Sequence, residues 1–441
     1  MARLRHITVI CVIGMVARSP FDPAYGLQDK PEPAHPTVDQ EKVDRAIQDG
    51  CRYLLSAADL YTSFGHGRRH QAEAMQAYGE LVLLTLAHSG YYKDGSAEIA
   101  RLIEHVLQKP IATTYTASLM AMALQKLDSR KYQWRIAQCA QFLVDNQCTN
   151  GQWDYGEPVP VDKFRPPMPT TAPKPPQDVA TQSSGRSSPT TAAEPKKKEA
   201  GRTSPLPRVP VQKRKNGPPN GDNSNAQYAA LGLRACLDAG IDVEISVLAR
   251  ARQWWLRSQN RDGGWGYCDC GSTGGGEENE KSVSNSSYGS MTVGAVGALC
   301  IYDYFLKMDY KNDPAVKSGV AWIAANYEVT RNPKKTNFAV LYYLYGLERV
   351  GLLYGTEKFG ANEWYPDGAN HLLQTQQGGT WNSGDRLVKG AAQTTVDTCF
   401  AILFLRRGTP RLKPPPPPVA TQGGGSAPPP PGASVPNPGT R

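Results

Sequence analysis

The sequence predicts an all-α fold in which about six pairs of helices close into a double ring, an α/α-toroid. Two observations lead to this prediction. Helical segments alternate between amphipathic and almost wholly apolar ones, and three corners between them contain a glutamine, a glycine and a tryptophan. Such alternation suits inner helices that are covered on both sides and outer helices that show one face to water.

The three corners form an internal repeat at the ends of amphipathic segments. They consist of Gln147, Gly151 and Trp153; Gln259, Gly263 and Trp265; and Gln376, Gly379 and Trp381. Glycine can adopt the positive φ that ends a helix sharply, and we expect it at both Gly263 and Gly264. The glutamine amide can satisfy backbone groups at a helix end, and the indole has a large surface to bury. The corners therefore specify architecture rather than chemistry.

The helices themselves are read from the spacing of apolar residues. The expected outer helices span residues 38–57, 99–107, 132–146, 246–258, 315–326 and 365–376. The expected inner helices span residues 71–88, 114–127, 223–238, 287–305, 337–350 and 394–406. No strand pattern persists for more than a few residues.

Composition divides the rest of the chain. The toroid is expected in two parts, residues 27–156 and 221–408, separated by residues 157–220, which are rich in Pro, Lys, Ser and Thr. Residues 409–441 are mostly Pro and Gly. Neither segment can bury enough apolar surface to offset the entropy of ordering. We therefore expect a disordered basic insertion at 157–220 and a disordered tail at 409–441.

The first 26 residues resemble a signal peptide. Arg3 and Arg5 precede an apolar run from Ile7 to Ala17, and Ala24-Tyr25-Gly26 would serve as a cleavage site. The run is too short to span a bilayer. We expect an exported protein, periplasmic or secreted, without an integral membrane span; the alternative is a weakly apolar, disordered start.

Charge and cysteine content limit the classes of function that the sequence supports. The net charge is +9, but residues 157–220 hold twelve Lys or Arg and only five Asp or Glu, so most of it lies in the insertion. No basic helix accompanies it, and we expect no nucleic-acid partner. Five cysteines in predicted helices are expected as small buried residues: Cys51, Cys139, Cys236, Cys300 and Cys399. Cys268 and Cys270, on a Gly-rich loop, could form a disulfide, bind a metal or do neither.

The corners resemble the Gln-Trp repeats of squalene and oxidosqualene cyclases, whose α/α-toroid is shared by protein prenyltransferase β subunits. The resemblance covers most of residues 38–407 apart from the insertion. It implies a central cavity that opens where the inner helices begin. The alternative is a set of coincidental Gly-Trp turns in another helical protein, such as an (α/α)6 glycosidase.

The catalytic motifs of these relatives are not recognisable. A hopene-type cyclase carries Asp-x-Asp-Asp-Thr-Ala at an inner-helix start, whereas this chain has Asp222-Asn223-Ser224-Asn225-Ala226, with Ser224 in place of the acid. A hydroxyl cannot protonate an alkene. Prenyltransferase β subunits bind zinc through Asp-x-Cys and a later His; Asp397-Thr398-Cys399 fits the first part, but no His follows. We predict no metal and no cofactor, and keep Asp397 as the candidate catalytic acid, with a helix-capping role as the alternative.

Polar and aromatic residues at inner-helix starts are the candidates for lining the cavity. They are Asp222, Asn225, Tyr228, Tyr288, Tyr342 and Thr395. Tyrosine rings can stabilise cations in a pocket, but they are also ordinary core residues. The same doubt applies to the polar residues, which also suit helix caps.

Three functions follow. The first is a cyclase- or prenyltransferase-like toroid that binds an apolar, isoprenoid-type small molecule in its central cavity, with or without catalysis. The second is a non-catalytic toroid that binds a protein or cell-envelope partner through residues 157–220 or the tail. The third is an (α/α)6 carbohydrate-active enzyme, which would need two carboxylates roughly 5–10 Å apart in the cavity.

Overall fold

Pairs of helices follow one another along most of the chain. This computed structural model describes residues 37–63, 78–158, 205–267, 286–336, 338–385, 388 and 392–412. The chain divides into two units, Met1–Thr37 and Val38–Arg441, and the second holds every element below. The expected signal peptide, Cys268 and Cys270 lie outside the described residues, as do most of the insertion and of the tail.

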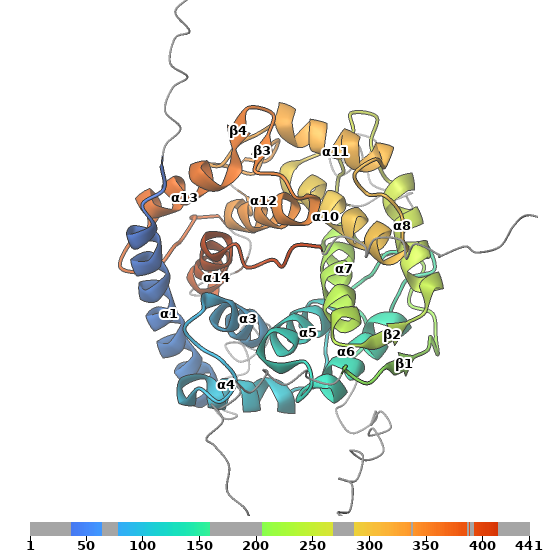
Figure 1. Cartoon of the computed structure of the whole chain (residues 1–441), viewed down its shortest axis with the longest axis horizontal. Coiled ribbons are helices and arrows are strands. Elements are labelled where there is room, and N and C mark those ends of the chain that lie inside the picture. Colours follow the sequence, from blue (N-terminus) through green and yellow to red (C-terminus); the bar gives the residue numbers. More distant parts are fainter. Residues whose placement is uncertain are drawn as a thin grey trace, which may run out of the picture. The chain divides into compact units, whose positions relative to one another are not determined.

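Six inner helices, counted over the described residues, form the wall of a ring (Figure 1). They are α3 (Gly79–Ser89), α5 (Thr114–Asp128), α7 (Asn223–Asp238), α10 (Gly289–Phe305), α12 (Val340–Tyr354) and α14 (Ala392–Arg406). Each packs against the next, and α14 packs against α3, so the ring closes. The predicted all-α toroid is confirmed. The inner helices are buried almost throughout, as their apolar sequences require.

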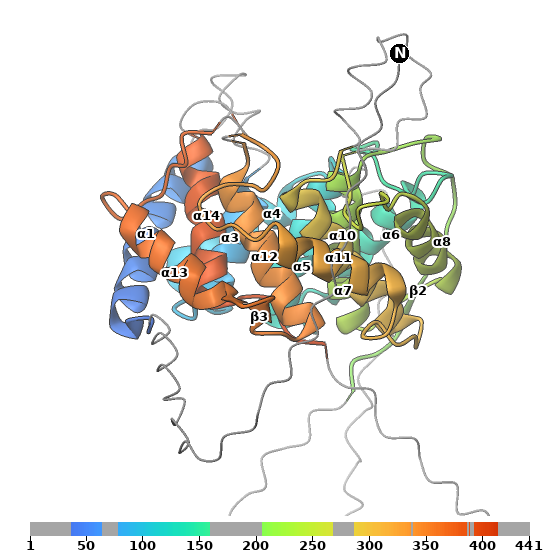
Figure 2. The same ribbon diagram turned by 90° about the horizontal axis from the view of Figure 1, so that it is seen from above.

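The second layer surrounds the first. The outer helices are α1 (Gln40–Ser63), α4 (Ala97–Gln108), α6 (Gln133–Asp145), α8 (Ile245–Arg257), α11 (Pro314–Ala325) and α13 (Trp364–Thr375). Helix α1 contacts both α13 and α14, which joins the two ends of the ring. Figure 2 shows that the helices run from one face of the ring to the other. In the part of the chain that the structure describes, no helix is both long and apolar enough to cross a membrane.

Short strands are the main feature that the sequence did not predict. Strand β1 (Val209–Val211) pairs in parallel with β2 (Ile241–Val243), and β3 (Lys358–Phe359) pairs antiparallel with β4 (Asn362–Glu363). Strand β1 lies inside the expected insertion, and its Val211 is buried. Residues 205–220 therefore belong to the ordered fold, and the expected boundary at residue 220 is too late.

The three corner tryptophans have the same geometry. Each indole is buried, and its Nε1–H donates to a backbone carbonyl of the outer helix that it follows. Trp153 donates to Leu143 at 2.7 Å, Trp265 to Trp255 at 2.9 Å and Trp381 to Leu372 at 2.8 Å. The indole thereby satisfies a carbonyl near the helix end while its ring fills the space between the two layers.

The corner glutamines reach in the other direction, to the next outer helix. The Nε2 of Gln147 donates to the carbonyl of Val247 in α8 at 2.8 Å, and that of Gln259 to Ala315 in α11 at 2.9 Å. Gln376 donates to Ala46 in α1 at 2.9 Å. This last bond joins the last outer helix to the first.

The corner glycines allow the backbone of each corner to come close to the next outer helix. Gly151, Gly263 and Gly379 have φ of 102°, 88° and 80°. A Cβ on Gly151 would lie 2.4 Å from the carbonyl oxygen of Arg250 in α8. The expectation of a positive φ at Gly264 is wrong; a Cβ there would lie 2.6 Å from the Cβ of Ser287, so close packing explains this glycine.

We expect Trp265→Ala to lower the free energy of unfolding by ~3–5 kcal/mol, because it removes a fully buried ring and leaves a cavity. Denaturant unfolding measures the loss. Trp134→Ala is the control, since Trp134 is 38% exposed and should cost less than ~1 kcal/mol. An equally small loss at Trp265 would contradict the packing described here.

We expect Gln376→Ala to lower the free energy of unfolding by about 1 kcal/mol, the usual net worth of one hydrogen bond. Because its partner carbonyl is in α1, amide hydrogen exchange should accelerate in α1 more than in α8 or α11. Gln377→Ala, at the neighbouring exposed position, is the control. Uniform acceleration across the three helices would show that the bond does not join the ring ends.

Candidate functional site

The central cavity lies where the inner helices begin. It has a volume of about 380 Å³ and receives residues from all six inner helices. Seven tyrosines are among the described lining residues: Tyr78, Tyr115, Tyr155, Tyr228, Tyr267, Tyr288 and Tyr342. Two phenylalanines, three hydroxyl residues and six aliphatic residues complete the lining: Phe338, Phe400, Thr113, Ser224, Ser290, Leu81, Leu119, Met291, Ala339, Val388 and Val396. The wall is therefore aromatic and aliphatic, with scattered hydroxyl groups.

Aromatic rings in contact with one another make up much of this wall. The ring centroids of Tyr115 and Tyr228 are 4.5 Å apart, those of Tyr228 and Tyr342 are 6.0 Å apart, and Phe400 lies edge-on to Tyr342 at 5.6 Å. Burial raises the pKa of the Tyr115, Tyr228 and Tyr342 hydroxyls. These phenols therefore stay protonated and act as neutral hydrogen-bonding groups.

Three of the six predicted cavity residues line the cavity, namely Tyr228, Tyr288 and Tyr342. Asp222 and Asn225 are not among the described lining residues, because Asp222 caps α7 and Asn225 donates to it. One Asp222 oxygen accepts hydrogen bonds from the Asn225 backbone N at 2.7 Å and from Ser224 Oγ at 2.9 Å, and the other accepts from Asn225 Nδ2 at 2.8 Å. Thr395 also lies outside the described lining, with its hydroxyl 3.2 Å from that of Tyr53.

Asp397, the predicted catalytic acid, is buried but lies outside the described lining. Its Oδ2 accepts from the backbone N and the hydroxyl of Ser383, at 2.7 and 2.8 Å, so it holds the loop after Trp381. Burial raises its pKa to about 6, partly offset by these donors. The carboxyl group therefore connects the loop after the third corner to α14 through hydrogen bonds.

Asp397 and Asp385 are two carboxylates linked by one glutamine side chain. Gln393 Nε2 donates to Asp397 Oδ1 at 2.9 Å and to Asp385 Oδ1 at 3.3 Å, while the other Asp385 oxygen accepts from the backbone N of Val340. Both acids are at most 5% exposed. The pair therefore satisfies backbone and amide donors and does not face a ligand across the cavity.

The residues considered for zinc do not form a site. Burial raises the pKa of the Cys399 thiol to about 12, and Thr85 is its hydrogen-bonding neighbour, whereas Asp397 points to Ser383. Within the described ranges no group of three His, Cys, Asp or Glu side chains is placed to hold a metal ion. The five cysteines expected to be buried are buried.

A buried arginine lies deeper in the ring than the cavity and was not predicted. Arg349 of α12 is 3% exposed, and its guanidinium carbon is 4.4 Å from the centroid of Tyr345 and 5.3 Å from that of Tyr228. Its Nη2 donates to Gln227 Oε1 at 3.0 Å, and Gln227 Nε2 donates to the Tyr342 hydroxyl at 2.7 Å. The sequence signal is a Glu-Arg pair in an otherwise apolar helix.

The chain after α14 crosses the ring (Figure 1). Thr409 donates through its N and its hydroxyl to the two oxygens of Glu348, at 2.9 and 2.7 Å, and Arg234 of α7 donates to the carbonyl of Pro410 at 2.7 Å. Thr409 and Pro410 border a small hollow of about 40 Å³ at the ends of the inner helices away from the cavity. The expected tail boundary at residue 409 is therefore too early, since residues 409–412 belong to the fold.

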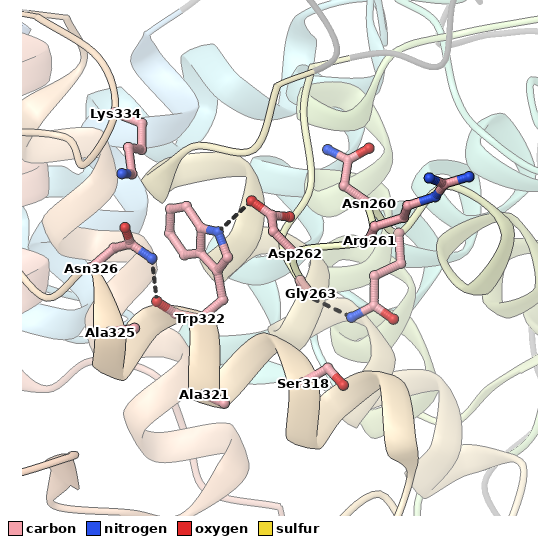
Figure 3. Close-up of a pocket in the computed structure, with 11 residues that line it drawn as sticks. Asn260, Arg261, Asp262, Gly263, Ser318, Ala321, Trp322, Ala325, Asn326 and Lys334 are labelled. Atoms are coloured by element: carbon pink, nitrogen blue, oxygen red, sulfur yellow. Dashed lines mark hydrogen bonds between the residues drawn. The ribbon is translucent and has the colours of Figure 1, made fainter. Parts of the chain in front are cut away.

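A larger hollow of about 650 Å³ lies outside the ring at the second corner (Figure 3). Several of its polar groups form hydrogen bonds within the corner. Trp322 Nε1 donates to Asp262 Oδ2 at 2.9 Å, and Gln259 Nε2 donates to the Gly263 carbonyl at 2.9 Å. Asn326 Nδ2 donates to the carbonyl of Trp322 at 2.9 Å. We therefore assign this hollow to the packing of the corner.

Comparison with known proteins gives a structural likeness. No protein-family model matches the sequence, and no curated protein matches it. Among solved structures, a variant of the type II terpene cyclase MstE from Scytonema, in complex with its substrate geranylgeranyl dihydroxybenzoate, is similar. The sequence identity is 12%, the TM-score is 0.44, and the alignment covers 83% of this chain and 97% of that one. A likeness of this size transfers no residue role.

The Glu348–Thr409 contact should make stability depend on pH. Burial raises the pKa of Glu348 from 4.5 to about 7. Between these values the folded chain holds a proton that the unfolded chain has lost. The contribution of Glu348 to stability is therefore complete below about pH 4.5 and is lost as the pH rises through about 7.

Glu348→Gln tests this, because the amide keeps the shape and cannot ionise. We expect the free energy of unfolding of the variant, relative to the native chain, to rise between about pH 5 and about pH 8, as urea unfolding would show. Asp397→Asn is a comparison at a second buried acid of raised pKa. Parallel pH profiles for Glu348→Gln and the native chain would contradict the assignment.

Proposed function

We propose that this toroid binds an apolar, isoprenoid-type small molecule in its central cavity. The observation that carries the proposal is the tyrosine-lined cavity at the inner-helix starts. Ligand sites are commonly concave and mostly apolar, with a few placed polar groups, and span about 300–1,000 Å³. A volume of about 380 Å³ is at the small end of that range and favours a short prenyl chain.

The nature of the wall supports binding as the central activity. Its rings and aliphatic side chains remove apolar surface from water, while Ser224, Ser290 and Thr113 offer hydroxyl groups to one polar end of a ligand. Phenols and alcohols are too weakly acidic to protonate an alkene. The two candidate acids, Asp222 and Asp397, are held by their own turns. We therefore propose a binding protein rather than a proton-initiated cyclase.

A cavity-filling substitution tests the proposal. Val396 of α14 lines the cavity and is 2% exposed, so Val396→Phe places a larger side chain in it. We expect mass spectrometry of co-purified lipids to find an isoprenoid on the native protein and at least about tenfold less on the variant.

Val320→Phe, on the partly buried face of outer helix α11, is the matched control and should keep the native lipid content. Thermal unfolding checks that both variants are folded. Recovery of no isoprenoid from the native protein, or equal amounts from all three proteins, would contradict the proposal.

A further inference from the structure

A permanent positive charge lies directly behind the wall of the central cavity. Arg349 is 3% exposed, and none of its hydrogen bonds or ion pairs within the described residues is to a carboxylate. Its Nη1 has no hydrogen-bond partner there. A buried arginine is normally paired with an acid, because an uncompensated charge is costly to bury. Here two tyrosine rings and one amide do most of the compensation.

Only one residue separates this charge from the cavity. Tyr228 contacts the guanidinium and also lines the cavity, and Gln227 connects the guanidinium to the hydroxyl of Tyr342, another lining residue. The effective dielectric constant between buried groups is lower than that of water, so the electrostatic effect of the guanidinium across Tyr228 is stronger than it would be in solution. Arg349 would therefore create a positive potential at the base of the cavity, where a ligand would bind.

The other charged groups around the cavity have partners of their own. Glu348 is next to Arg349 in sequence, but both of its oxygens accept hydrogen bonds from Thr409 at the far end of the ring. Asp222, at the start of α7, accepts three hydrogen bonds from neutral donors and keeps its negative charge near Tyr115 and Tyr267, whereas Arg349 lies deeper, beyond Tyr228. Lys335 adds a second cation, with its amine 4.6 Å from the centroid of Tyr288. Two further acids, Asp385 and Asp397, both accept from the amide of Gln393.

The tyrosines of the cavity therefore differ from a cage for cations. An aromatic cage attracts a cationic ligand through the negative faces of its rings. In this protein Arg349 lies over Tyr228, and Lys335 lies over Tyr288. Two of the rings that such a cage would use are already occupied by cations of the protein.

We propose that the cavity selects its apolar ligand by charge, accepting a chain that ends in a carboxylate and rejecting the same chain when it ends in an amine. Arg349 is the residue that determines this specificity. The inference rests on the proposed function, because it describes the polar end of the ligand that the cavity would bind.

Three probes with one carbon chain test the proposal: farnesoic acid, farnesol and farnesylamine. At about pH 7.5 the acid is anionic, the alcohol neutral and the amine cationic. Their affinities for the full-length protein are measured by competition against one fluorescent fatty-acid probe. We expect the acid to bind at least about tenfold more tightly than the amine, with the alcohol between them.

Arg349→Met keeps a long side chain and removes the charge, so the difference between acid and amine should shrink to less than about threefold. Lys317→Met, at an exposed position of α11, is the matched control and should keep the native order. If Arg349→Met does not fold, the order of the three probes on the native protein remains the test.

The outcomes separate the two proposals. Equal binding of the three probes, or tighter binding of the amine, overturns selection by charge and leaves the apolar cavity as proposed. The native order in a folded Arg349→Met variant overturns the role of Arg349. Binding of none of the probes contradicts the proposed function, and the charge selection with it.

Discussion

The hydrogen bond from a corner glutamine to the next outer helix is the interaction on which the ring depends. Each inner helix packs against inner neighbours on both sides, whereas three of the outer helices are joined directly to the next outer helix by a corner glutamine. A side-chain amide that reaches the first turns of the following helix fixes the placement of that helix, and the tryptophan fixes the preceding helix. The same bond from Gln376 to Ala46 joins residues 330 positions apart in sequence. The first and last outer helices are therefore joined by the same kind of hydrogen bond that joins neighbouring outer helices at the other two corners.

Closure has a direct consequence for the site. Because the inner helices are joined through outer helices, they all run in the same direction, and all of their N-terminal ends meet on one face. The residues there come from six helices and surround a space that none of them fills. At the other end, the segment after α14 crosses the ring and is held by Glu348 and Arg234. The cavity is thus set by the architecture, and its chemistry by which side chains stand at the first turns of the inner helices.

The sequence predicted those parts of the structure that repeat. Six amphipathic and six apolar helices were expected and are present in the described residues, and the corner at Gln259 to Trp265 packs as its residue types require. Features that occur once were missed. Strand β1 is three residues long and contains Pro210, so no alternation could reveal it. Gly264 was expected to have a positive φ, but its reason is the proximity of Ser287, which a sequence does not contain.

The polar residues of the site show why its chemistry was harder to predict than its fold. An acid at the start of a helix has two uses, to cap the helix or to face the cavity, and Asp222 and Asp397 show that local donors decide between them. A capping carboxylate gains hydrogen bonds from its own turn at little entropic cost, whereas one that faces an apolar cavity loses its water without compensation. Arg349 has no carboxylate partner; its guanidinium lies over Tyr345, one turn earlier in α12, and over Tyr228 of α7. Its position could not be read from the sequence, because the rings that hold it come from two helices more than a hundred residues apart. The charge behind the cavity wall is therefore one that tertiary packing placed there, whereas Asp222 and Asp397 stabilise turns of the surrounding helices.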